Sequence, residues 1–101
     1  MTSTEKLHAY LAAFSELDAD SLLSTVTDDF RTFFESGKSY GKLDLPDYVA
    51  GLKKEAPRLV VTDLMVEGNQ AWIKWRLGER VGAGLIKFGL DGVSEEQLFL
   101  G

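Results

Sequence analysis

The chain of 101 residues carries eleven basic and sixteen acidic side chains, a net charge of −5, with no cysteine and one histidine. The acidic balance disfavours a nucleic-acid backbone as partner. The absence of cysteine excludes disulfides and thiolate chemistry, and a single histidine argues against a zinc site. A hydrophobic fraction of 45% is ordinary for a globular protein, and no apolar run is long enough to cross a bilayer. We therefore expect residues 1–101 to form one domain without a metal, a cofactor or a membrane contact.

The N-terminus predicts an amphipathic helix from Glu5 to Leu17. Thr2 and Glu5 have the spacing of a capping box. Charged residues interrupt this segment where a secretory signal needs a continuous apolar run, so we expect a cytoplasmic protein. The apolar residues recur at spacings of three and four and form one stripe, composed of Leu7, Tyr10, Leu11, Phe14 and Leu17. The hydroxyl of Tyr10 is the polar group in that stripe.

Two further helices and a strand follow. The cap residues from Asp18 to Ser21 predict a short helix through Val26, and a third helix begins at Asp44 and ends before Pro57. Between them, aromatic and β-branched residues from Asp29 to Glu35 predict a strand. Side chains alternate along a strand, so one face carries Phe30, Thr32 and Phe34, and the other carries Arg31, Phe33 and Glu35. We expect a turn or short hairpin at Ser36 to Gly41.

The rest of the chain predicts a meander of four strands: Leu59–Val66, Ala71–Leu77, Leu85–Leu90 and Val93–Leu100. Gly68-Asn69 and Asp91-Gly92 are typical hairpin turns. In the connection from Gly78 to Gly84, the glycines indicate a bend or a bulge. The order of these elements predicts an α+β fold with a curved antiparallel sheet, against which the first helix packs.

The strand that contains both tryptophans has two distinct faces. Alternation places Ala71, Ile73, Trp75 and Leu77 on the core side. Trp72 lies on the opposite face between two cations, Lys74 and Arg76. Either the aliphatic stems of these cations shield the indole, or the three residues form a subunit contact, since tryptophan and arginine are enriched in interfaces. We expect a homodimer through this outer face of the sheet.

The chain resembles the nuclear transport factor 2-like superfamily, in particular its SnoaL-like and ketosteroid isomerase-like members. The resemblance covers nearly the whole chain and rests on the order and spacing of six segments. These segments are Tyr10 to Phe14, Asp18 with Asp20, Thr27 to Phe30, Gly41 before the third helix, Val66-Glu67-Gly68 into Ile73-Lys74-Trp75, and Phe88 through Asp91-Gly92-Val93 into Glu95. It implies the cystatin-like α+β barrel, with helices that close a highly curved sheet and a ligand that enters the mouth of the cone.

The resemblance also implies where isomerase chemistry would reside. Ketosteroid isomerases use a carboxylate base on the first strand, and an oxyanion hole of a helix tyrosine and a protonated aspartate. The tyrosine corresponds to Tyr10, but the base corresponds to Phe34 and the aspartate to Ile86. An isomerase reaction without a base is not credible. Glu35, next to the base position, is either a pocket carboxylate brought inward by a bulge or the solvated end of a strand.

We expect a pocket for a small, largely hydrophobic molecule such as a polyketide-, steroid- or terpene-like compound. Its predicted lining is Tyr10, Phe14, Phe30, Phe34, Tyr48, Trp75, Ile86 and Phe88. If the protein is a cofactor-free isomerase, cyclase or hydrolase, Tyr10 is the hydrogen-bond donor or acid and Glu35 the base. The alternative is a non-enzymatic dimerising scaffold, or protein-interaction domain, whose cone is filled by its own side chains.

Overall fold

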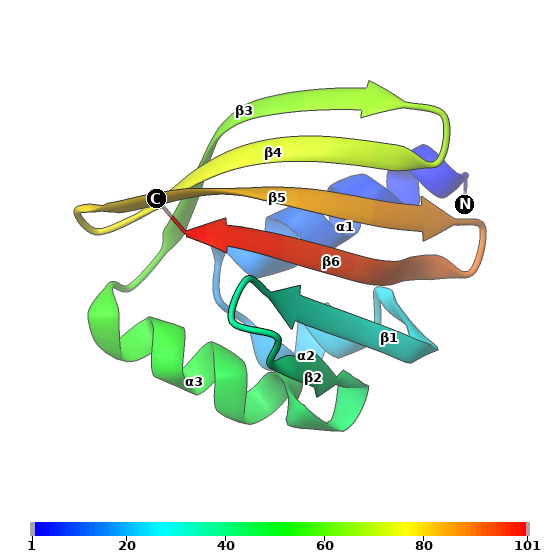
Figure 1. Cartoon of the computed structure of the whole chain (residues 1–101). Coiled ribbons are helices and arrows are strands. Elements are labelled where there is room, and N and C mark those ends of the chain that lie inside the picture. Colours follow the sequence, from blue (N-terminus) through cyan, green and yellow to red (C-terminus); the bar gives the residue numbers. More distant parts are fainter. Residues whose placement is uncertain (1, 101) are drawn as a thin grey trace.

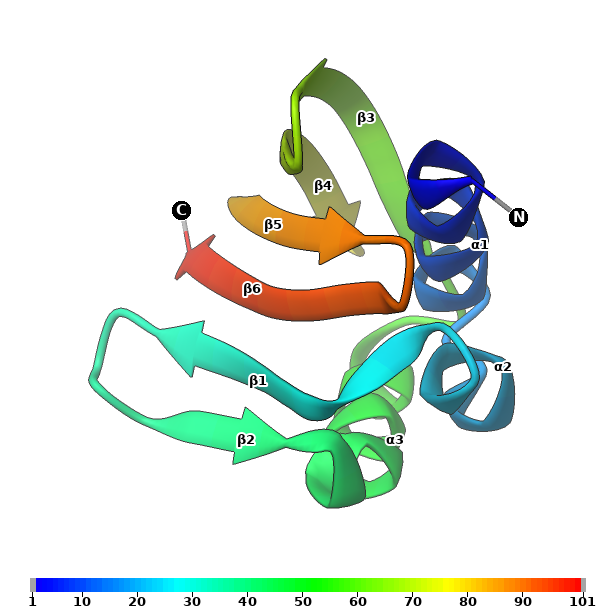
Figure 2. The same ribbon diagram turned by 90° about the vertical axis from the view of Figure 1, so that its right-hand side faces the viewer.

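The computed structural model describes residues 2–100, which fold into a curved sheet with helices on its concave side (Figures 1 and 2). The helices are α1 (Ser3–Ser15), α2 (Ala19–Leu23) and α3 (Leu45–Glu55), and a 3-10 turn, η1 (Lys42–Asp44), precedes α3. The strands are β1 (Val26–Phe34), β2 (Ser39–Gly41), β3 (Leu59–Glu67), β4 (Gln70–Leu77), β5 (Arg80–Gly89) and β6 (Gly92–Leu100). The predicted α+β class and curved sheet are confirmed.

The sheet has the strand order β2-β1-β6-β5-β4-β3 and is mixed rather than antiparallel. β1 pairs with β6 in parallel, whereas the other four pairings are antiparallel. A parallel pair needs a long crossover connection. Here β2, α3 and the strands β3 to β5 lie between the two strands along the chain, and local sequence patterns carry no information about such a distant pairing. The predicted short hairpin after β1 is the strand β2, at the edge of the sheet.

Helix α1 begins as the capping box predicts. The Thr2 hydroxyl accepts from the Glu5 amide at 3.1 Å, and the Glu5 carboxylate accepts from the Thr2 amide at 3.2 Å. The predicted stripe is buried in the hydrophobic core. Helix α1 lies against the concave face of the sheet (Figure 2). The next helix, α2, ends at Leu23 and does not reach Val26, because Val26 already pairs with β6 as the first residue of β1.

The glycines of β5 do not form the predicted bend. Gly82 and Gly84 lie within a strand whose register with β4 is continuous, and Gly82 is the direct partner of Trp75. A Cβ added to Gly82 would lie 2.7 Å from the carbonyl oxygen of Phe99, and closer still to the indole of Trp75. The absence of a side chain therefore makes room for Trp75 on the concave face, instead of bending the chain.

A β-bulge in β6 decides which side chains reach the interior. Phe88 of β5 is the partner of Val93 and Lys87 is the partner of Glu95, so Ser94 is an extra residue on β6. A bulge of this kind interrupts the alternation of side chains. Val93 and Glu96 consequently both point into the core, each with 0% of its surface exposed.

Candidate functional site

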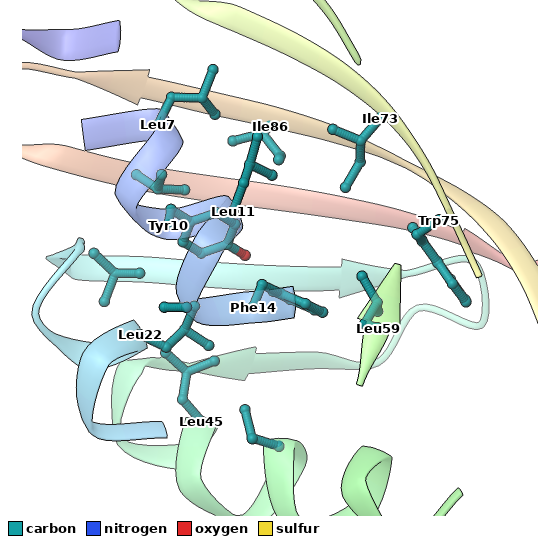
Figure 3. Close-up of a cluster of buried hydrophobic side chains, with 14 of the residues drawn as sticks. Leu7, Tyr10, Leu11, Phe14, Leu22, Leu45, Leu59, Ile73, Trp75 and Ile86 are labelled. Atoms are coloured by element: carbon teal, nitrogen blue, oxygen red, sulfur yellow. The ribbon is translucent and has the colours of Figure 1, made fainter. Parts of the chain in front are cut away.

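A tyrosine and a glutamate meet at the centre of the cone. Tyr10 extends from α1 into the buried apolar cluster, with its ring 5.8 Å from that of Phe14 and 6.3 Å from that of Phe30 (Figure 3). Its hydroxyl donates a short hydrogen bond to Oε1 of Glu96. Neither side chain has measurable exposure to solvent. We call this pair the Tyr10–Glu96 dyad.

Burial controls the protonation of the dyad. Removal from water disfavours the carboxylate and raises the pKa of Glu96 to about 7, against the lowering effect of the hydrogen bond from Tyr10. Burial, followed by the charge of Glu96, raises the pKa of Tyr10 well above its ordinary value. The tyrosine therefore stays protonated, while the glutamate changes charge near neutral pH. A carboxyl group of this pKa is suited to general acid or base catalysis.

Three polar side-chain atoms are buried without a hydrogen-bond partner among residues 2–100: Thr32 Oγ1, Trp75 Nε1 and the second carboxylate oxygen of the dyad, Glu96 Oε2. Thr32 is the direct partner of Glu96 across β1 and β6. The free oxygen of Glu96 lies 3.0 Å from the position of a Cβ on Gly84. Gly84 pairs with Leu98, which follows Glu96 by two residues on β6. The carboxyl group of Glu96 is therefore inclined along the strand toward Leu98.

A cavity of about 90 Å³ lies beside Leu98 in the interior of the cone. Its lining comes from two helices, α1 and α3, and from five strands, and consists of Phe14, Phe34, Tyr48, Leu52, Glu55, Leu59, Trp75, Arg80 and Leu98. Leu98 follows Glu96 by two residues on the same face of β6, so the cavity begins roughly 6.6 Å from the dyad along the strand. The dyad lies beneath the inner end of the cavity and does not line it.

Charged and aromatic residues surround the outer part of the cavity. Arg80 donates to the Glu55 carboxylate at 2.5 Å, and both side chains are partly exposed at the rim. Tyr48 packs edge-on against Phe34, with ring centroids 5.7 Å apart. Burial, and next the charge of Glu96, raise the pKa of the Tyr48 hydroxyl far above its ordinary value. Tyr48 thus lies within the electrostatic influence of both the dyad and the rim.

The structure divides the predicted ligand-binding residues into two groups. The first group lines the cavity and comprises Phe14, Phe34, Tyr48 and Trp75. The second is buried in the surrounding core and comprises Tyr10, Phe30, Ile86 and Phe88. Glu35 is exposed in the turn after β1, and the structure does not bring it to Tyr10. The carboxylate that Tyr10 contacts belongs instead to Glu96.

Sequence reasoning missed Glu96 because of the bulge. Strict alternation from Val93 places Glu95 inside and Glu96 outside, and the extra residue Ser94 reverses this order. Glu96 is the direct partner of Ile86, the position where the family resemblance implies an aspartate. The interior therefore has a carboxylate after all, one strand away from the expected position. Nothing in the sequence around Ser94 marks the bulge.

The opposite, convex face of the sheet carries the predicted contact residues. Trp72, Lys74 and Arg76 are all exposed, and the Trp72 indole retains 46% of its surface. Its ring stacks on that of Phe99 from β6, with centroids 6.1 Å apart and planes inclined by 25°. These two aromatic residues form an exposed apolar patch on the convex face, across β4 and β6.

No group of three or more histidine, cysteine, aspartate or glutamate side chains among residues 2–100 could hold a metal ion. None of the helices in this part of the chain is long and apolar enough to span a membrane.

Solved structures of similar fold cover nearly the whole chain. A protein from Jannaschia sp. CCS1 described as a SnoaL-like polyketide cyclase has 23% identity and a TM-score of 0.77, over 98% of this chain and 87% of that one. An uncharacterised cystatin-fold protein from Novosphingobium aromaticivorans has 19% identity and a TM-score of 0.78, over 98% of each chain. A hypothetical protein with a ketosteroid isomerase-like fold from Catenulispora acidiphila, in complex with trimethylamine, has 14% identity and a TM-score of 0.73, over 97% of this chain and 86% of that one.

No protein-family model and no curated protein sequence matches the chain. At these identities the structural likeness establishes the fold, which is that of the SnoaL-like and nuclear transport factor 2-like proteins, as the sequence resemblance predicts. Chemistry has to be argued from the residues of the site, because one fold hosts many activities.

Proposed function

We propose that the protein binds a small, largely hydrophobic molecule in the cavity of its cone. The observation that carries the proposal is an apolar, aromatic-lined cavity beside a buried polar pair, the usual composition of a small-molecule site. A volume of about 90 Å³ is well below the roughly 300–1,000 Å³ of sites for drug-sized ligands. We therefore expect a ligand of a few non-hydrogen atoms, smaller than a polyketide or a steroid. The trimethylamine bound to the Catenulispora protein is a molecule of that size.

The dyad supports cofactor-free chemistry as the enzymatic form of this proposal. Tyr10 would donate a hydrogen bond or a proton, and Glu96 would act as the base in an isomerase, cyclase or hydrolase reaction. Glu96 is a better base than Glu35, because it contacts Tyr10 and has a pKa of about 7. Both groups are fully buried, so a substrate has to reach them through the cavity.

A ligand screen with a filled-cavity variant tests the binding proposal. Compounds that bind the native state raise the melting temperature. Leu52→Trp should fill the cavity and abolish the shifts, whereas Leu43→Trp, at a position that is 93% exposed, should retain them. The indole N–H signal of Trp75 should move with the same compounds in NMR spectra. Shifts that survive Leu52→Trp would place binding elsewhere and contradict the proposal.

The second candidate function is a dimerising scaffold, and the exposed Trp72–Phe99 stack favours it. We propose that two copies associate through the convex face, since aromatic residues and arginine are enriched in interfaces. Size-exclusion chromatography should then show a dimer that Trp72→Glu converts to a monomer. Leu90→Glu, which changes an exposed residue in the β5–β6 turn, should leave the dimer intact. A monomer-sized wild-type protein would refute this candidate.

A further inference from the structure

We propose that the cavity takes a small alkylammonium cation, with its alkyl groups against the aromatic wall and its positive charge toward Glu96. This inference deepens the proposed binding function and rests on it. It follows from three features: the rings that line the cavity, the charges around it, and the orientation of the free oxygen of Glu96.

The aromatic wall is suited to a cation with an apolar surface. Four of the nine lining residues are aromatic: Phe14, Phe34, Tyr48 and Trp75. The faces of aromatic rings carry a negative potential that attracts ammonium groups, and cages of such rings bind alkylated ammonium ions. Leu52, Leu59 and Leu98 complete an apolar surface for the alkyl groups.

The charges around the cavity favour a cation over an anion. Arg80 and Glu55 form an ion pair at 2.5 Å, so their charges compensate each other at the rim. Glu96 has no salt-bridge partner among residues 2–100. The uncompensated charge beside the cavity is therefore that of the Glu96 carboxylate. Opposite charges attract strongly where water is excluded, so a cation gains from this position and an anion is repelled.

The free oxygen of Glu96 points in the required direction. Oε1 is occupied by the Tyr10 hydroxyl, whereas Oε2 has no partner and lies over Gly84, at the level of Leu98 in the cavity wall. A buried polar atom without a partner is costly, and native structures usually satisfy such atoms. A cation at the inner end of the cavity would stabilise the ionised carboxylate through its charge, without a direct hydrogen bond to Oε2.

Binding should then depend on pH. The polar groups that face Glu96 are Tyr10 from α1, Tyr48 from α3 and Thr32 from β1, whereas β5 contributes Ile86 and Gly84, and the Glu55–Arg80 pair lies farther out at the rim. Of these neighbours, both tyrosines remain protonated near neutral pH. A cation stabilises the ionised glutamate, so its binding strengthens as the pH rises through about 7.

Two probes of nearly equal size and different charge provide the test. We would titrate the protein with tetramethylammonium chloride and with tert-butanol, and follow the indole N–H signal of Trp75 by NMR at pH 6 and pH 8. With a pKa of about 7, ionisation of Glu96 increases about tenfold over this range, so tetramethylammonium should bind about tenfold more tightly at pH 8. At pH 8, tert-butanol should bind at least about fivefold more weakly than tetramethylammonium. The affinity for tert-butanol should be the same at pH 6 and pH 8.

Matched variants identify the residue responsible. Glu96→Gln keeps the shape of the side chain and should remove both the preference for the cation and its pH dependence, whereas Glu95→Gln should preserve both. Phe34→Leu should weaken tetramethylammonium binding about fivefold and tert-butanol binding less.

Equal affinities for the two probes, or a cation affinity unchanged in Glu96→Gln, would overturn the inference and leave the proposed small-molecule site intact. Failure of both probes to bind would also overturn the inference, and the ligand screen with Leu52→Trp then decides the proposed function separately.

Discussion

Glu95 and Glu96 are adjacent in the chain and lie in opposite environments. Glu95 faces the convex side of the sheet, where its partly exposed carboxylate lies 3.5 Å from the ammonium group of Lys87. Glu96 faces the concave side, where it has no exposure and its partner is a tyrosine hydroxyl. The carboxylate of Glu95 thus takes part in a weak surface ion pair, whereas the carboxyl group of Glu96 has a pKa of about 7.

The difference teaches that burial, more than residue type, gives this carboxylate its chemical character. We expect the convex face to tolerate substitution, because its side chains remain hydrated and can change rotamer. The concave face combines close packing, unpartnered polar atoms and one titrating group. Substitutions on the two faces should therefore differ sharply in their effects.

The largest effect should come from added volume on the concave side of β5. Gly82→Ala places a Cβ against the Phe99 carbonyl oxygen at 2.7 Å and against the Trp75 ring, and backbone cannot shift cheaply. We expect a loss of about 3 kcal/mol in the free energy of unfolding, measured by urea denaturation. Gly89→Ala on the same strand meets no atom within 4 Å and should change stability by less than about 1 kcal/mol. Similar values for both variants would contradict the packing described for Trp75.

The next effect is on the pH dependence of stability. The pKa of Glu96 is about 7 in the folded state and about 4.5 in the unfolded chain. The unfolded chain therefore releases this proton at lower pH than the folded state does. Consequently, the free energy of unfolding decreases as the pH rises from about 4.5 to 7. Glu96→Gln removes this loss. Between pH 5 and pH 8, its stability relative to wild type should increase by on the order of 2 to 3 kcal/mol. Glu95→Gln should follow the wild-type profile within about 0.5 kcal/mol. A constant difference between wild type and Glu96→Gln would show that Glu96 titrates normally.

These contrasts show what the sequence could predict. The stripe from Leu7 to Leu17, the Thr2 cap and the Gly68-Asn69 turn depend on neighbours within a few residues, and the structure contains all three. Gly82 and Gly84 were misread because the side chains that pack over them lie on other strands: Trp75 over Gly82, and Ile73 with Glu96 over Gly84. Phe34 and Trp75 face the cavity, because side chains alternate regularly from Phe30 to Phe34 and along β4.

The dyad could not be found in the same way. It depends on an extra residue at Ser94 and on a contact between positions 10 and 96, from opposite ends of the chain. Alternation is a local rule, and one bulge reverses it for every following residue of the strand. The sequence therefore drew attention to Tyr10 as a hydrogen-bond donor, but paired it with the exposed Glu35 instead of Glu96.

A smaller effect is expected from the tyrosine of the dyad. Tyr10→Phe removes the hydrogen bond to Glu96 and should cost about 1 to 2 kcal/mol of stability at pH 8. The pKa of Glu96 should rise further, because that hydrogen bond lowers it. Replacing both partners, Tyr10→Phe with Glu96→Leu, should recover most of the loss, since no polar group is then left unpaired. Additive losses in a double-mutant cycle by urea denaturation would show that the two side chains do not interact.

The smallest effect should be a gain. Thr32 buries a hydroxyl without a partner on the concave face, next to Glu96. Thr32→Val keeps the shape and removes the unsatisfied group, so the free energy of unfolding should increase by about 0.5 to 1 kcal/mol. Thermal and urea denaturation of this variant would measure the change. A loss of stability would reveal that the hydroxyl has a bound water or ligand as its partner.

The bulge at Ser94 also affects how this fold can acquire or lose chemistry. With two acidic residues in succession, the length of the strand selects which one enters the interior, and no side chain has to be replaced. Insertion or deletion of a single codon near Ser94 would exchange their positions, together with those of Gln97 and Leu98. In the design of new binding proteins on this scaffold, moving the extra residue along β6 is thus a means of relocating an interior acid.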